Sequence, residues 1–99
     1  MDAKKIIDES IERFNKSQSK YRIKNSEDFE LIGENSSLDS LAIVNFLTII
    51  ENQVFKNINI KKDIVNKIFN DKKEKLYIKD LFLILEKWFE NDINSKKLY

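Results

Sequence analysis

The sequence predicts an all-α domain, a small helical bundle of three long helices and one short helix. Apolar residues recur at helical spacing in several stretches of the chain. The chain has one glycine and no proline, which disfavours a turn-rich β architecture. Its 99 residues suffice for one hydrophobic core. We therefore expect a single domain over residues 1–99, with its core at about 3–91 and a flexible tail at 92–99.

The first helix is expected over residues 3–16, where apolar side chains form one stripe. The stripe consists of Ala3, Ile7, Ile11 and Phe14, with Ile6 beside it. Residues 17–39 are polar and predict a long loop, the kind of segment that often carries function in a small domain. Scattered apolar side chains should hold this loop to the core: Ile23, Phe29, Leu31 and Ile32.

The second helix should begin at Asp39 or Ser40, since both are good N-caps, and run to about Val54. Its inward stripe is expected to be Ile43, Phe46, Leu47, Ile50 and Val54. Leu41, Val44 and Thr48 then lie on an outer face. A small core does not need this second apolar face, so it is a candidate surface for a partner. A rotation of the helix would instead bury Leu41 and Val44.

The remaining helices follow from the same periodicity. Residues 62–69 predict a short third helix, and residues 70–75 a charged linker. The last helix is expected over residues 77–91 and has the clearest apolar pattern of the chain. That pattern consists of Ile78, Leu81, Phe82, Leu85, Trp88 and Phe89.

The composition excludes several kinds of chemistry. The chain has no Cys and no His, so it lacks thiolate catalysis, the commonest general base and the usual transition-metal ligands. Its carboxylates do not have the spacing of a calcium loop, so we expect no metal site. No nucleophile–base pair can be assembled from ordinary residues, so we do not expect an enzyme. The longest apolar run, 41–50, is too short to span a bilayer, and the N-terminus lacks a signal-peptide core. A cytoplasmic monomer without membrane insertion is the expectation.

Charge is distributed unevenly along the chain, although the net charge is only +1. Residues 25–55 contain no Lys or Arg but hold six acidic residues: Glu27, Asp28, Glu30, Glu34, Asp39 and Glu51. Such a window predicts an acidic surface around Ser40, which would attract a basic partner and repel nucleic acid.

Residues 33–51, GENSSLDSLAIVNFLTIIE, resemble the acyl carrier proteins and their peptidyl-carrier relatives, the phosphopantetheine-binding family. The shared signature is Asp39-Ser40-Leu41 at the head of the second helix, followed by a hydrophobic helix that reaches Glu51. The chain length, the long first loop, the short third helix and the start of the last helix extend the similarity over most of the chain. The fold implied is the four-helix bundle of the acyl-carrier type.

The resemblance implies that a phosphopantetheinyl transferase attaches 4'-phosphopantetheine from coenzyme A to Ser40 Oγ. The arm would hold an acyl or aminoacyl group as a thioester for enzymes of fatty acid, polyketide or nonribosomal peptide biosynthesis. Partners would be a loading ligase for the acyl or aminoacyl group and downstream transferases or synthases. The residues expected to recognise them are Asp39, Leu41, Val44, Asn45, Thr48 and Glu51. Asn45 replaces an acidic residue common in the family, and with the near-neutral net charge this favours a dedicated, stand-alone carrier.

Other readings of the same residues stay open. Ser40 could be a plain helix N-cap, and Glu51 a solvated helix residue. The chain could be a non-covalent helical adaptor that binds partners through Leu41, Val44 and Thr48. A binder of membrane surfaces or nucleic acid, built on the Lys-rich C-terminal half, would have a weak field because acidic residues are mixed in.

Overall fold

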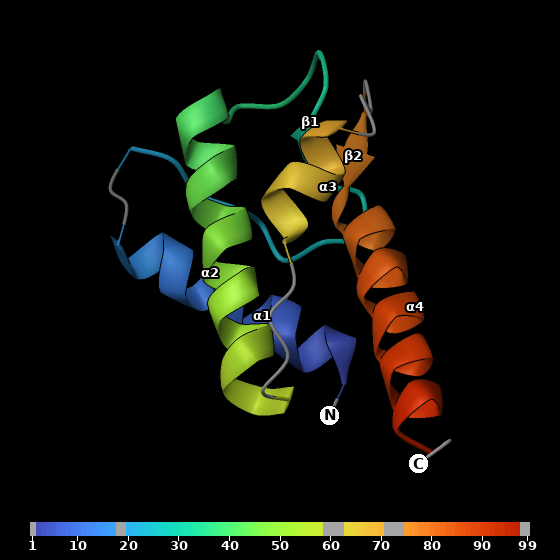
Figure 1. The fold of residues 1–99 in the computed structure, drawn as a ribbon. Coiled ribbons are helices and arrows are strands. Elements are labelled where there is room, and N and C mark those ends of the chain that lie inside the picture. The colour runs from blue at the N-terminus through green and yellow to red at the C-terminus, as the bar shows by residue number, and fades with distance from the viewer. Residues whose placement is uncertain (1, 18–19, 59–62, 71–74, 98–99) are drawn as a thin grey trace.

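Helices dominate the computed structural model, which describes residues 2–17, 20–58, 63–70 and 75–97. In chain order, the described elements are α1 (Ala3–Ser17), β1 (Glu30–Ile32), α2 (Ser40–Ile58), α3 (Ile64–Asn70), β2 (Leu76–Tyr77) and α4 (Ile78–Lys97). Helix α1 crosses behind α2 and packs against both α2 and α4, while α3 packs against α2 (Figure 1). Within the described residues, no helix is long and apolar enough to cross a bilayer.

The core forms where the predicted apolar stripes of the helices meet. The four residues of the α1 stripe, the adjacent Ile6 and all five residues of the inward α2 stripe are buried. Phe14 of α1 meets Phe46 of α2 edge to face, with ring centroids 5.8 Å apart. From α4, Ile78, Leu81, Leu85 and Phe89 complete the core, and Phe82 and Trp88 pack at its margin. The helical periodicity therefore identified the core correctly.

The long loop after α1 is held to the core as expected, with an additional polar clamp. Ile23 and Leu31 are buried, and Phe29 and Ile32 are half-buried against the core. The side chain of Asn15 in α1 binds the backbone of Ile23 on both sides. Its Nδ2 donates to the Ile23 carbonyl (2.9 Å), and its Oδ1 accepts from the Ile23 N–H (2.8 Å).

A small sheet corrects the prediction of an exclusively helical chain. β1 and β2 pair antiparallel. Glu30 lies opposite Tyr77 and Ile32 lies opposite Leu76, with a shift of register between these two pairs. The ladder continues into the start of α4, where the N–H of Ile78 donates to the Phe29 carbonyl (3.0 Å). Strands of three and two residues are too short to show alternation in the sequence, so periodicity could not reveal them.

Several helix ends differ from the prediction. α2 continues past Val54 to Ile58, and α4 continues past Asn91 to Lys97, where a flexible tail was expected. α3 begins at Ile64, and the start of the predicted range, residue 62, lies outside the described residues. Most of the predicted linker, residues 71–74, also lies outside them.

Candidate functional site at the head of helix α2

Asp39 forms the N-cap of α2, one of the two possibilities that the sequence offered. Its carboxylate oxygen Oδ1 accepts the Ala42 N–H (2.8 Å), and its carbonyl accepts the Ile43 N–H (3.0 Å). The hydrogen bond from the Ala42 backbone and then that from the Tyr21 hydroxyl lower the pKa of Asp39 from its ordinary value. Asp39 thus satisfies the start of the helix and places Ser40 in its first turn.

Tyr21 ties the long loop to this cap. Its hydroxyl donates to Asp39 Oδ2 at 3.0 Å, and Lys20 Nζ lies 5.3 Å from the centre of its ring. The positive charge of Lys20 also contributes to lowering the pKa of Asp39. Sequence reasoning missed Tyr21. The available signal was an aromatic residue within an otherwise polar stretch, and the structure shows that it is half-buried.

Ser40 is exposed, and its hydroxyl forms no hydrogen bond with the residues that the structure describes. The interpretation of Ser40 as the cap is wrong, because the side chain of Asp39 performs that role. Asp39 also places a carboxylate at the positive end of the α2 dipole. A phosphodiester on Ser40 would therefore lie beside an existing anion, outside the cap. The hydroxyl is chemically free for modification by an enzyme that supplies its own base.

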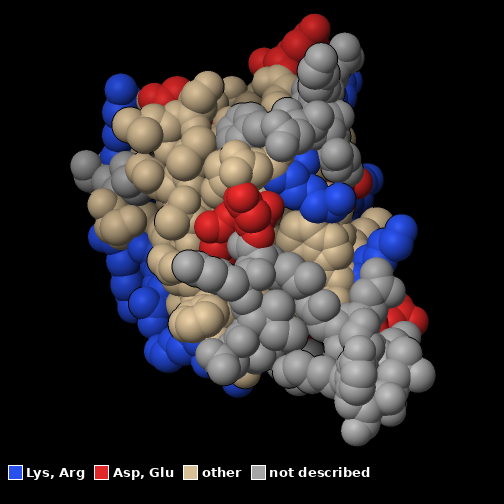
Figure 2. All heavy atoms as spheres, viewed as in Figure 1, with Lys and Arg blue, Asp and Glu red and all other residues tan. Residues whose placement is uncertain are grey.

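The outer face of α2 is open where the sequence suggested it. Leu41 is 68% exposed, the highest value among the large apolar side chains of the described residues. Thr48 is exposed, and Val44 and Asn45 are half-buried. The alternative in which helix rotation buries Leu41 is therefore wrong. In the view of Figure 2, mainly uncharged residues form the surface over the first half of α2.

Glu51 lies on a different part of α2 and connects it to α3. Its Oε1 accepts the Val65 N–H at 2.9 Å, near the start of α3, and the side chain is half-buried. A carboxylate is favourable there because the first N–H groups of a helix have no partner within the helix. The interpretation of Glu51 as a solvated residue is therefore wrong.

The loop before α2 is ordered by Glu30, which sequence reasoning had assigned only to the acidic window. Glu30 is buried, and its Oε2 accepts the Asn35 N–H at 2.8 Å. Its Oε1 has no hydrogen-bond partner among the described residues. Gly33 has a φ of 144° and lies so close that a Cβ at this position would overlap the Glu30 carboxylate. Ser36 then turns the loop toward α2 by donating from Oγ to the Leu31 carbonyl (2.7 Å).

The acidic surface expected around Ser40 is smaller than the sequence suggested. Glu30 is inside the fold, and Glu51 binds the start of α3. Asp28 lies 3.9 Å from Lys79 at the start of α4. The acidic residues of 25–55 are thus separated in space or lie near cations. The negative potential at Ser40 is therefore weaker than six neighbouring carboxylates would produce.

Comparison with models of known protein families gives no match to this chain, and comparisons with curated proteins and with solved structures give no significant match either.

Proposed function

We propose that this chain is a carrier of acyl or aminoacyl groups, held as thioesters on a 4'-phosphopantetheine arm attached to Ser40. The observation that carries the proposal is the free, exposed hydroxyl of Ser40 in the first turn of α2. Asp39 caps the helix in its place, so modification of Ser40 costs no capping bond. A base of the transferase would take the Ser40 proton as Oγ bonds to the phosphorus next to pantetheine, the pyrophosphate P–O bond of coenzyme A would break, and 3',5'-ADP would leave.

The arrangement of the elements supports the same proposal. A long loop separates α1 from α2, α3 is short, and a long α4 follows, which is the order expected of a four-helix bundle of the acyl-carrier type. The β1–β2 ladder is an additional feature of this chain. In this role the protein would supply no catalytic group and would present its cargo, as a cytoplasmic monomer, to the enzymes that load and use it.

Partner enzymes would approach the surface next to Ser40. Leu41, Val44, Asn45 and Thr48 form the α2 part of that surface, and Asp39 fixes its edge. The half-buried Glu51 would act indirectly, by holding α3 against α2. Apolar and uncharged polar side chains predominate here, so recognition would depend on shape and apolar contact more than on charge.

Intact-mass spectrometry tests the attachment. The purified chain is incubated with coenzyme A and a promiscuous phosphopantetheinyl transferase, and the wild type should gain the mass of one phosphopantetheine. Ser40→Ala should gain none. Ser37→Ala, which removes an exposed serine three residues earlier, is the matched control and should be modified normally. Absence of an adduct with several transferases, or an adduct on Ser40→Ala, would contradict the proposal.

The exposure of Leu41 also favours a second candidate, a non-covalent adaptor that uses the outer face of α2. In that case Ser40→Ala would leave partner binding intact, whereas Val44→Asp would abolish it. Under the carrier proposal both variants fail to receive cargo, Ser40→Ala because it has no arm and Val44→Asp because partner enzymes no longer dock.

A further inference from the structure

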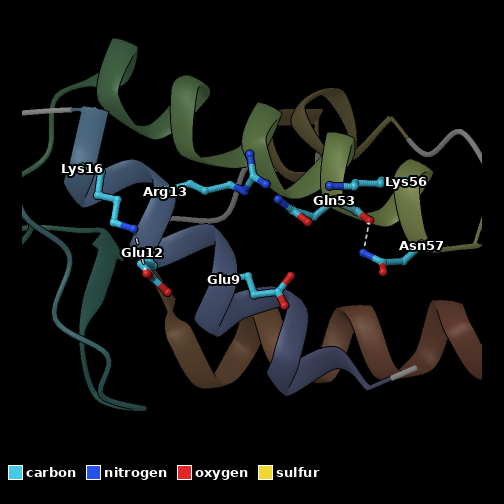
Figure 3. Close-up of a pocket in the computed structure, with 7 residues that line it drawn as sticks. All are labelled: Glu9, Glu12, Arg13, Lys16, Gln53, Lys56 and Asn57. Carbon is cyan, nitrogen blue, oxygen red and sulfur yellow. Dashed lines mark hydrogen bonds and ion pairs between the residues drawn. The ribbon is translucent and has the colours of Figure 1, made fainter.

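A polar hollow of about 570 Å³ lies between α1 and the C-terminal half of α2, far from Ser40 (Figure 3). Along the axis of α2, Gln53 is about 20 Å from Ser40. On α1, Glu9 and Arg13 are four residues apart and share the face beside the apolar stripe. On α2, Gln53, Lys56 and Asn57 share a face for the same reason. The hollow is therefore built by the polar edges of two helices whose apolar faces pack together.

Three cationic side chains line this hollow, and two of them have no ion pair among the described residues. Arg13 and Lys56 form no ion pair with the residues that the structure describes. Their neighbours Glu12 and Lys16, in contrast, pair with each other at 3.0 Å. Figure 3 shows the side chains of Arg13 and Lys56 directed toward Gln53 from opposite sides. Two like charges thus approach the same point, and neither has an ion-pair partner among the described residues.

Gln53 contributes an unpaired donor to the hollow, next to the two cations. The residue is only 4% exposed, yet its side-chain amide forms no hydrogen bond with the described part of the chain. The amide atoms are not among the side-chain polar atoms sealed from water, so they face the open hollow and are available to donate to a ligand there. This amide lines the hollow between the two cations, where an oxyanion would accept from all three groups.

We propose that this hollow binds an acidic segment of a partner protein through its unpaired cations. Its lining consists of Glu9, Glu12, Arg13, Lys16, Gln53, Lys56 and Asn57. A guanidinium, an ammonium and the Gln53 amide match a carboxylate in charge and in donor geometry, while the Asn57 amide donates to the Gln53 backbone carbonyl. The Glu9 carboxylate on the opposite side disfavours a uniform polyanion such as nucleic acid. Small-molecule sites are mostly apolar and enclosed, whereas this one is polar and open.

The shape supports a segment rather than a single ion. A second hollow of about 430 Å³ shares Arg13, Lys16 and Gln53 with the first and adds the half-buried Ile49. The two hollows form a continuous surface that offers an apolar contact beside the cationic point. A peptide with an acidic side chain next to an apolar one would complement both.

A peptide titration tests this proposal. The ¹⁵N-labelled full chain is titrated with a blocked synthetic peptide in which one Glu and one Asp flank a Leu and the other residues are uncharged. Signals of the Arg13 and Lys56 backbone amides and of the Gln53 side-chain amide should shift. Fluorescence anisotropy gives the Kd, which should rise about tenfold in the Arg13→Gln/Lys56→Gln double variant. The same peptide with Gln and Asn in place of Glu and Asp should not bind.

Controls separate a specific site from general charge. Arg22→Gln/Lys67→Gln removes the same two charges at exposed positions without ion pairs among the described residues, and should keep the wild-type Kd. The proposal fails if this control weakens binding equally, or if the shifts map elsewhere. It also fails if inorganic phosphate or a single-stranded oligonucleotide binds as tightly as the peptide. Phosphopantetheine loading of Arg13→Gln/Lys56→Gln should remain normal, so this proposal and that for Ser40 can fail separately.

Discussion

At Asp39, one side chain combines a helix cap with a bond to a distant loop. It accepts from the Ala42 N–H and from the Tyr21 hydroxyl, and both bonds favour the ionised carboxylate. Helix start and loop position therefore depend on the charge state of a single group. That dependence gives the head of α2 a defined response to acid.

Acidification should weaken the head of α2. The folded-state pKa of Asp39 lies below its ordinary value, so its contribution to stability is present above the unfolded pKa and is lost as pH falls through the folded one. Asp39→Asn keeps a capping oxygen but cannot ionise. The urea midpoint of the wild type should exceed that of Asp39→Asn at pH 7, and the difference should narrow as pH falls below the ordinary pKa of an aspartate.

Glu34→Gln, which removes an exposed charge nearby, controls for the change in net charge and should show no such closing difference. A gap between the wild type and Asp39→Asn that is constant with pH would show that the charge of Asp39 does not stabilise the fold.

In the loop before α2, Gly33 is the position where a substitution should be most destabilising. Its positive φ disfavours any other residue, and a methyl group would displace the Glu30 carboxylate from its bond to Asn35. We expect Gly33→Ala to lower the free energy of unfolding by about 1–3 kcal/mol, measured by urea denaturation. Ser37→Ala, in the same loop, should change it little. Equal midpoints for the two variants would mean that the loop relaxes freely.

At the scale of elements, α3 depends on α2 for its position more than on its own length. Seven residues are too few for a stable isolated helix. Burial of Ile64 and Ile68 and the bond from the Val65 N–H to Glu51 hold it in place. Glu51, which was expected to recognise partner enzymes, thus helps to hold α3 against α2.

Glu51→Ala should loosen α3 locally. Loss of one hydrogen bond to a carboxylate removes about 1–2 kcal/mol, so the Val65 amide should exchange about tenfold faster with deuterium. Glu51→Gln keeps an acceptor oxygen and should show a smaller effect. Glu86→Ala, on the exposed side of α4, is the control. An unchanged exchange rate of the Val65 amide in Glu51→Ala would show that Glu51 does not stabilise the start of α3.

At the scale of the whole molecule, the sequence predicted what depends on periodicity and missed what depends on contacts between distant segments. Ile7, Phe14, Phe46 and Leu85 were assigned to the core because burial follows helical spacing. The pattern ends at Phe89, so it gave no sign that α4 continues to Lys97.

The candidate site divides in the same way. The position and exposure of Ser40 followed from the local pattern of a cap before an apolar helix. The choice of Asp39 over Ser40 as cap involves Tyr21, eighteen residues away, which no local rule identifies. The hollow beside Gln53 requires the relative placement of α1 and α2, which spacing within one helix does not give.

The pairing of β1 with β2 has a consequence for how the chain folds. It joins Ile32 to Leu76, so α2 and α3 lie inside a closed loop of chain. Closing a long loop lowers the entropy of the chain, and the few backbone hydrogen bonds of the ladder offset this loss only weakly. Contacts between α1 and α2, in contrast, span a shorter sequence separation and bury much of the core. The ladder should therefore form after the folding transition state. Weakening it should accelerate unfolding and leave the folding rate nearly unchanged.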